Sequence, residues 1–116
     1  MDLVDLVYNT LSPLKIPVMW EIRPEKPPGI SYHFFNESGI LFGDGETKRS
    51  IVSCQIDIWF RRKEDVNLKN KVKKTMKNAG FLEPNSYTVY DDKVNLYHTV
   101  MVFNYNYEES EDNEYN

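Results

Sequence analysis

The amino-acid sequence predicts an α+β fold, with a single, mainly antiparallel β-sheet packed with two α-helices in the order α-β-β-β-α-β-β. Two segments, one near the N-terminus and one beyond the middle, space their apolar residues like the buried side of a helix. Between them, residues 50–62 alternate between two sets of side chains, as a strand does. The other strand-like segments are separated by turn residues, which favours antiparallel neighbours. At 116 residues the chain has the size of one domain.

The first predicted element is a helix over residues 3–12. Asp2 can cap its N-terminus, while Pro13 and Pro17 end it near Ser12. Its one-sided spacing is carried by Leu3, Leu6, Val7, Thr10, Leu11 and Leu14.

Two strands follow the helix. Residues 18–22 form the first, with Val18, Trp20 and Ile22 expected on one face. Residues 30–35 form the second, because they are β-branched and aromatic. The connection between them contains Pro24, Pro27 and Pro28, which cannot donate ladder hydrogen bonds and make it rigid.

The clearest strand, residues 50–62, leads into the second helix, residues 65–79. The core face of that strand is expected to carry Val52, Cys54, Ile56, Ile58 and Phe60. The buried stripe of the helix is expected to be Leu68, Val72, Met76 and Ala79. Gly80 stands where a left-handed C-cap is needed, and Phe81 follows to seal the helix end.

The last two strands, residues 86–90 and 96–107, form a hairpin around the turn at residues 91–93. They complete a domain over residues 1–107. Residues 108–116 hold five acids and no base, and without these acids the formal net charge of −4 becomes +1. This segment has no apolar periodicity, so we expect a flexible acidic tail beside a nearly neutral body.

The sequence contains no constellation of residues that would support catalysis, a cofactor or a metal ion. The two histidines, His33 and His98, stand mid-strand without ligand spacing, and Cys54 has the parity of a core residue. Acids near the turns, such as Asp91 and Asp92, are what turns prefer. No apolar run approaches the roughly 20 residues that span a bilayer, so no membrane partner is expected.

Residues 36–49 are predicted to form a long loop or a loosely paired hairpin that carries binding. Within it, an apolar triplet precedes a turn, which gives the candidate interface Ile40, Leu41, Phe42, Gly43, Asp44 and Gly45. The alternative is an ordinary long hairpin whose triplet packs on its own domain. Trp59 joins the candidate interface because it points to the face of its strand opposite the core residues. It therefore lies either under a helix or between subunits. Ring formation is expected through the sheet edges and exposed aromatic residues.

Several stretches occur together, in order, in one family. They are residues 30–36 (ISYHFFN), 43–46 (GDGE), 54–60 (CQIDIWF), 76–81 (MKNAGF) and 96–98 (LYH). With them, residues 1–107 resemble the small tail-terminator, or tail-completion, proteins of long-tailed bacteriophages and prophages. These stretches mark strand faces and turns, and they include no active site.

The resemblance implies a structural virion protein that is not an enzyme, assembled in the bacterial host cytoplasm. Such a subunit forms a hexameric ring that caps the head-proximal end of the tail tube and stops its polymerisation. The implied partners are further copies of itself, the tail tube protein and the head–tail connector or stopper, with DNA passing through the lumen. Two alternatives remain open: a neck or head-completion protein (stopper or adaptor), and a nucleic-acid-binding accessory domain that uses the basic residues 61–77.

Overall fold

The computed structural model describes residues 2–42 and 47–109 of the chain. The order of helices and strands is α-β-β-β-α-β-β, which confirms the predicted fold class. The elements are α1 (Leu3–Leu11), β1 (Val18–Trp20), β2 (Gly29–Phe42), β3 (Thr47–Phe60), α2 (Leu68–Asn78), β4 (Leu82–Asp91) and β5 (Leu96–Glu109). Short 3₁₀ turns at Ser12–Leu14 and Lys63–Asn67 follow α1 and precede α2. Neither helix is long and apolar enough to cross a bilayer.

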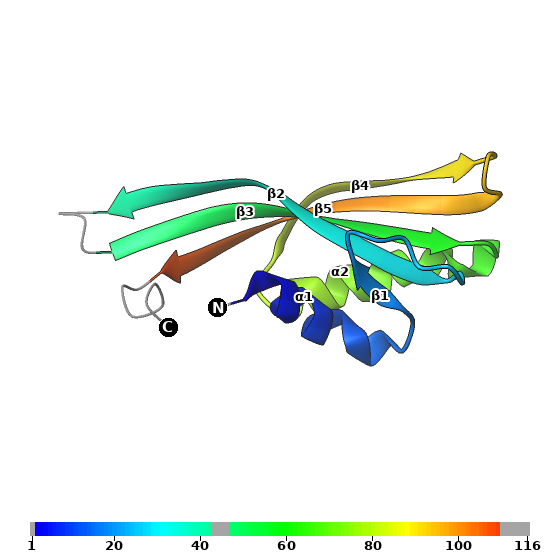
Figure 1. The fold of residues 1–116 in the computed structure, drawn as a ribbon, viewed down its shortest axis with the longest axis horizontal. Helices are drawn as coiled ribbons and strands as arrows, with labels where there is room; N and C mark the ends of the chain where they lie inside the picture. Colours follow the sequence, from blue (N-terminus) through cyan, green and yellow to red (C-terminus); the bar gives the residue numbers. More distant parts are fainter. Residues whose placement is uncertain (1, 43–46, 110–116) are drawn as a thin grey trace.

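The five strands form one sheet in the order β1-β2-β3-β5-β4. β1 pairs with β2 in parallel, whereas the other three pairings are antiparallel. Both helices lie on the same face of this sheet (Figure 1). The molecule therefore has two layers, one of helices and one of strands.

The hydrophobic core lies between the helices and one face of the sheet. The predicted core residues of β3, namely Val52, Cys54, Ile56, Ile58 and Phe60, are at most 1% exposed. Val7 and Leu11 of α1 and Val72 and Met76 of α2 meet them and are fully buried. The apolar residues that alternate along β3 and those spaced at helical intervals in α1 and α2 thus belong to the same core.

Local capping explains where both helices begin or end. The Asp2 carboxylate accepts a hydrogen bond of 2.9 Å from the Val4 amide and caps α1. After α2, Gly80 adopts a left-handed φ of 101°. The Gly80 amide donates to the Lys77 carbonyl, and the Phe81 amide donates to the Met76 carbonyl at 3.1 Å. This pair of bonds is a Schellman arrangement, and it confirms the left-handed C-cap predicted at Gly80.

β1 is shorter than predicted. Val18 and Trp20 share a face, opposite Ile30 and Tyr32, as expected, whereas Ile22 lies beyond the end of the strand. Val18 is 9% exposed, but Trp20 and Ile22 are 48% and 59% exposed. The strand ends at Trp20 because Glu21 takes a left-handed φ of 64°. That conformation breaks the alternation of side chains, so residues beyond it do not continue the buried face.

Residues 36–49 contain a long β-hairpin and not an extended loop. β2 continues to Phe42 and β3 starts at Thr47, with a register shift between Phe35 and Ser38 and pairing resumed from Ser38 opposite Ile51. β5 accompanies them to Glu109, two residues into the segment assigned to the tail. Residues 36–42, 47–51 and 105–109 together form a three-stranded arm that extends beyond the helices (Figure 1).

Candidate functional site

The face of the sheet opposite the helices has no helix on it among the described residues, and we call it the open face. The register defines it as the side chains that alternate with the core residues. From β1 across to β4 these include Met19, Ser31, His33, Phe35, Ser53, Gln55, Asp57, Trp59, His98, Val100, Val102, Tyr87 and Val89. An uncovered sheet face is available to a partner.

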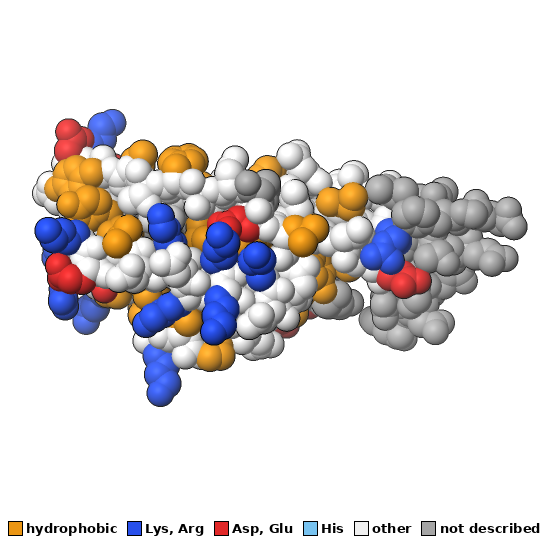
Figure 2. All heavy atoms as spheres, turned by 180° about the vertical axis from the view of Figure 1, so that it is seen from behind, with side chains coloured by type: hydrophobic (Ala, Val, Ile, Leu, Met, Phe, Trp, Pro, Cys, Tyr) orange, Lys and Arg blue, Asp and Glu red, His pale blue; other side chains and the backbone are white. Residues whose placement is uncertain are grey.

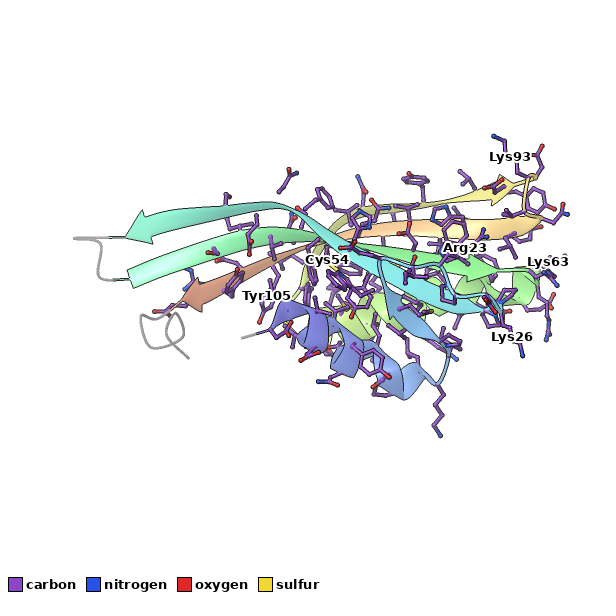
Figure 3. The ribbon with its side chains drawn as sticks, in the orientation of Figure 1. Arg23, Lys26, Cys54, Lys63, Lys93 and Tyr105 are labelled. Carbon is purple, nitrogen blue, oxygen red and sulfur yellow. The ribbon has the colours of Figure 1, made fainter. Side chains whose placement is uncertain are left out.

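Trp59 occupies this open face, so it does not lie under a helix. Its indole Nε1–H donates to the Ser31 hydroxyl at 3.1 Å. The ring stacks on His98 with 3.8 Å between centroids and 11° between planes. The Arg23 guanidinium lies 5.3 Å from the Trp59 ring centroid, in cation–π range. Three contacts from three segments therefore hold the indole in a fixed orientation. Arg23, which makes the third contact, is labelled in Figure 3.

Asp57 is a nearly buried carboxylate in the middle of the open face. Its side-chain Oδ1 lies 2.6 Å from His98 Nε2 and accepts a 2.9 Å hydrogen bond from Gln55 Nε2. Asp57 is 6% exposed, and such burial of an acid is costly unless it is paired. His98 therefore has a structural partner, as expected of a mid-strand histidine.

Asp57 was not among the site residues predicted from the sequence. The sequence did contain a sign of it, namely an acidic residue in the middle of a strand whose other residues alternate with apolar ones. Such a carboxylate needs a hydrogen-bond donor from a neighbouring strand.

Cys54 is not placed to react with the Asp57–His98 pair. Cys54 lies on the opposite face of β3 and is fully buried. Burial raises the pKa of the Cys54 thiol to about 12, so the thiol stays protonated near neutral pH. No group of three metal-ligating His, Cys, Asp or Glu residues occurs in the part of the chain that the structure describes.

Apolar side chains flank the cluster on the open face. Val89 of β4 is opposite His98 in the register, and Tyr87 is opposite Val100. Both are exposed, as is Met19 of β1 at the other side of the sheet. A rigid tryptophan with polar neighbours, and exposed apolar residues farther across the same sheet face, suits the anchor of a protein–protein interface.

Two strand edges are also open. Among the described residues β4 pairs only with β5, so its outer edge has no neighbouring strand there along Leu82–Asp91. β1 covers β2 only at Ile30, Ser31 and Tyr32, so residues 33–42 have no outer neighbour within the described residues. Unpaired edges of this length can pair with another chain.

The structure does not bring the two parts of the predicted interface together. Trp59 is opposite Gly29 at the start of β2, whereas Phe42 ends the same strand. The backbone of Ile40, Leu41 and Phe42 pairs with that of Arg49, Lys48 and Thr47. The side chains of this triplet, and all of Gly43, Asp44 and Gly45, lie outside the described residues.

The sequence matches no family model and no curated protein. The fold does match a solved structure, one chain of the particle described as "Virion of native gene transfer agent (GTA) particle". The TM-score is 0.60 and the identity 14%, over 92% of this chain and 95% of that chain. The similarity therefore covers nearly the whole length of both chains and shows that they share a fold.

Proposed function

We propose that this chain is a non-enzymatic structural component of a phage-like virion, and that its role is that of a tail terminator. The observation that carries the proposal is the shared fold, over nearly all of both chains, with a component of a gene transfer agent virion. The terminator role rests on the resemblance of residues 1–107 to that family. The open face supports an assembly role, because its anchor residues suit a protein partner and form no reaction centre.

Copies of the chain join into a ring through different surfaces of neighbouring subunits. The free edges of β2 and β4 lie on opposite sides of one sheet. Pairing β2 of one copy with β4 of the next makes a head-to-tail interface, and such an interface generates a ring when the rotation closes. Six copies and a lumen for DNA follow from the family resemblance. In this assembly the arm reaches toward the tail tube.

The ring is tested by light scattering of the purified protein and by electron microscopy of the particles that it forms. The terminator role is tested by deleting the gene and measuring tail lengths. Loss of a terminator gives overlong tails, because tube polymerisation no longer stops. Tails of normal length that fail to join heads would instead identify a stopper or adaptor. A protein that stays monomeric at every concentration would contradict the proposed assembly.

The apolar triplet at the arm is tested by replacing Ile40, Leu41 and Phe42 with Ser. We expect unchanged melting with unjoined or overlong tails, because the triplet contacts a neighbouring subunit or the tail tube. Lost thermal stability with intact assembly would instead place the triplet against its own domain. Replacing Tyr8, an exposed residue of α1 that does not lie on the open face, with Ser gives a control for general surface effects.

The nucleic-acid alternative is tested by the salt dependence of DNA binding. Several lysine contacts to phosphate would weaken affinity by orders of magnitude, roughly 10³-fold or more, between about 50 and 200 mM salt. We expect weak binding without sequence preference, because the body of the protein is nearly neutral.

A further inference from the structure

An apolar groove lies on the face of the sheet that the helices cover, at the end that carries the β4–β5 turn. It has a volume of about 410 Å³ and is lined by Phe60, Lys63, Glu64, Val66, Thr88 and Tyr97. Beside it, Tyr90 is 53% exposed and packs edge-on against Tyr97, with 5.0 Å between ring centroids. Figure 2 shows hydrophobic side chains gathered at this end of the molecule, with acidic and basic side chains around them.

A large exposed side chain on the same face, Trp20, lies at the opposite edge of the sheet. Trp20 is opposite Tyr32 in the β1–β2 register, and Tyr32 is buried under the helices, so both point to the covered face. The helices nevertheless leave Trp20 48% exposed. Four strand spacings separate β1 from β4, roughly 19 Å at about 4.8 Å each, so Trp20 does not fill the groove of its own chain.

The register places Trp20 and the groove at nearly the same height along the strands. The cross-strand row that starts at Val18 ends at Thr88 in the groove wall, and the row that starts at Trp20 ends at Ser86. A second copy set edge to edge at this height brings Trp20 to within two residues of Thr88, about 7 Å along the strand. An indole ring spans a gap of that size.

We propose that Trp20 of one copy binds in the apolar groove of the next copy. The inference rests on the ring of the proposed function, which sets the β1–β2 edge of one subunit beside β4 of its neighbour. At the height of Thr88 the outermost strand of that edge is β1, and the free part of β2 lies farther along it. Because β1 and β4 run in opposite directions, equally oriented copies meet in antiparallel fashion and keep their covered faces on one side.

Charge complementarity supports the same contact between edges. Lys15 stands three residues before Val18, and Asp91 stands three residues after Thr88, so in antiparallel contact both lie on the turn side of the groove. Lys15 has no carboxylate within 4 Å in the part of the chain that the structure describes. Asp92, next to Asp91, is exposed. A base on one edge therefore meets two acids on the other.

The apolar contact supplies the affinity, and the charges supply the alignment. A tryptophan that enters a pocket removes a large apolar area from water and loses little conformational freedom, which is why it often dominates an interface. The walls of the groove lose their contact with water at the same time. Exposed ion pairs add little affinity but disfavour a wrong register.

The first test measures assembly of the full chain by light scattering. We expect Trp20→Ala to raise the concentration at half-assembly roughly 30-fold or more, and Trp20→Phe to recover part of this loss. Tyr8→Ala is the matched control, because Tyr8 is an aromatic residue of α1 with the same 48% exposure, and it should assemble like the wild type. A Trp20→Ala protein that assembles at the wild-type concentration would overturn the proposal.

A disulfide locates the contact directly. In W20C/V66C, mild oxidation should join subunits into a ladder of covalent multimers, whereas W20C or V66C alone can give nothing above a dimer. Cys54 does not interfere, because it is fully buried. Rings that form in solution without such a ladder in the double variant would overturn the contact and leave the ring standing.

A charge swap tests the alignment of the edges. K15D and D92K should each weaken assembly severalfold at low salt, and K15D/D92K should restore it. A double variant as weak as the two single ones would contradict this arrangement.

Amide hydrogen exchange of the wild type needs no substitution. Residues 18–22 and 63–67 should exchange more slowly in the assembled protein than in the dilute monomer. Protection elsewhere on the edges with none at residues 63–67 would overturn the contact alone. A wild type that stays monomeric at every concentration would overturn the ring and the contact together, so the two failures are told apart.

Discussion

The two faces of β3 are built from alternate residues of one strand, and they differ in what holds them. On the covered face, apolar side chains such as Ile56 and Ile58 are fully buried under α1 and α2. On the open face, hydrogen bonds and ring stacking to side chains of other strands hold Trp59 and Asp57 in place. Burial of apolar area is not directional, whereas hydrogen bonds and ring stacking are.

Under the proposed function, this difference separates stability from recognition. The covered face supplies the apolar burial that makes folding favourable. The open face keeps a rigid indole and exposed apolar neighbours in place without sealing them from solvent, as a docking surface requires. One strand can do both because its side chains alternate with a period of two.

The largest expected effect comes from breaking the covered face. Ile56→Ala should lower the free energy of unfolding by about 3 to 4 kcal/mol, because it leaves a cavity in a fully buried cluster. Urea denaturation measures this loss. Its neighbour on the open face gives the control, since Gln55→Ala removes a single hydrogen bond to Asp57 and should cost less than about 1.5 kcal/mol. Equal losses in the two variants would refute the division of roles between the faces.

Trp59→Ala tests the open face. The variant loses the hydrogen bond to Ser31 and the stacking on His98, so we expect a loss of about 2 kcal/mol in unfolding free energy. Virion assembly should fall as well, because the open face loses the anchor of its proposed protein contact. Trp59→Phe keeps an aromatic ring and should recover part of both. Normal melting together with normal assembly would remove Trp59 from either role.

The burial of Cys54 predicts a loss of stability in alkali. The pKa of its thiol rises from an ordinary 9.0 to about 12 through burial, so the folded state keeps the proton that the unfolded chain releases. The protonated thiol therefore makes its full contribution to the free energy of unfolding below about pH 9. This contribution is lost as pH rises toward 12, with roughly 1 kcal/mol lost between pH 9 and 10. In Cys54→Ala this part of the pH dependence should vanish, although the variant starts from a lower stability. An unchanged slope of unfolding free energy against pH would show that the thiol is not protected.

The smallest expected effect concerns the attachment of α1 to the covered face. The Tyr32 hydroxyl donates to the Val4 carbonyl at 2.8 Å. Tyr32→Phe removes this bond and keeps the ring, so we expect a loss of about 0.5 to 1 kcal/mol by urea denaturation. Hydrogen exchange of the first amides of α1 should speed up in the same variant. Unaltered exchange there would mean that packing of Val7 and Leu11 alone holds the helix.

Local patterns in the sequence determined much of this protein. Asp2 and Gly80 mark helix ends through bonds to residues a few positions away, so their roles are readable without a fold. The alternation of β3 predicted which of its side chains are buried, because the period of a strand is a property of the backbone.

Other features were decided only by tertiary structure. The turn residues allowed either a loop or a hairpin over residues 36–49, and the pairing of β2 with β3, with β5 alongside β3, decides for paired strands in the described residues 38–42 and 47–49. Ile22 is exposed because the chain turns at Glu21 after its last partner in β2. Asp57 and His98 are 41 residues apart, and the β3–β5 register brings them to 2.6 Å. Periodicity reports which face a side chain takes, but its partner on that face is set by strand order and register, which arise when the sheet assembles.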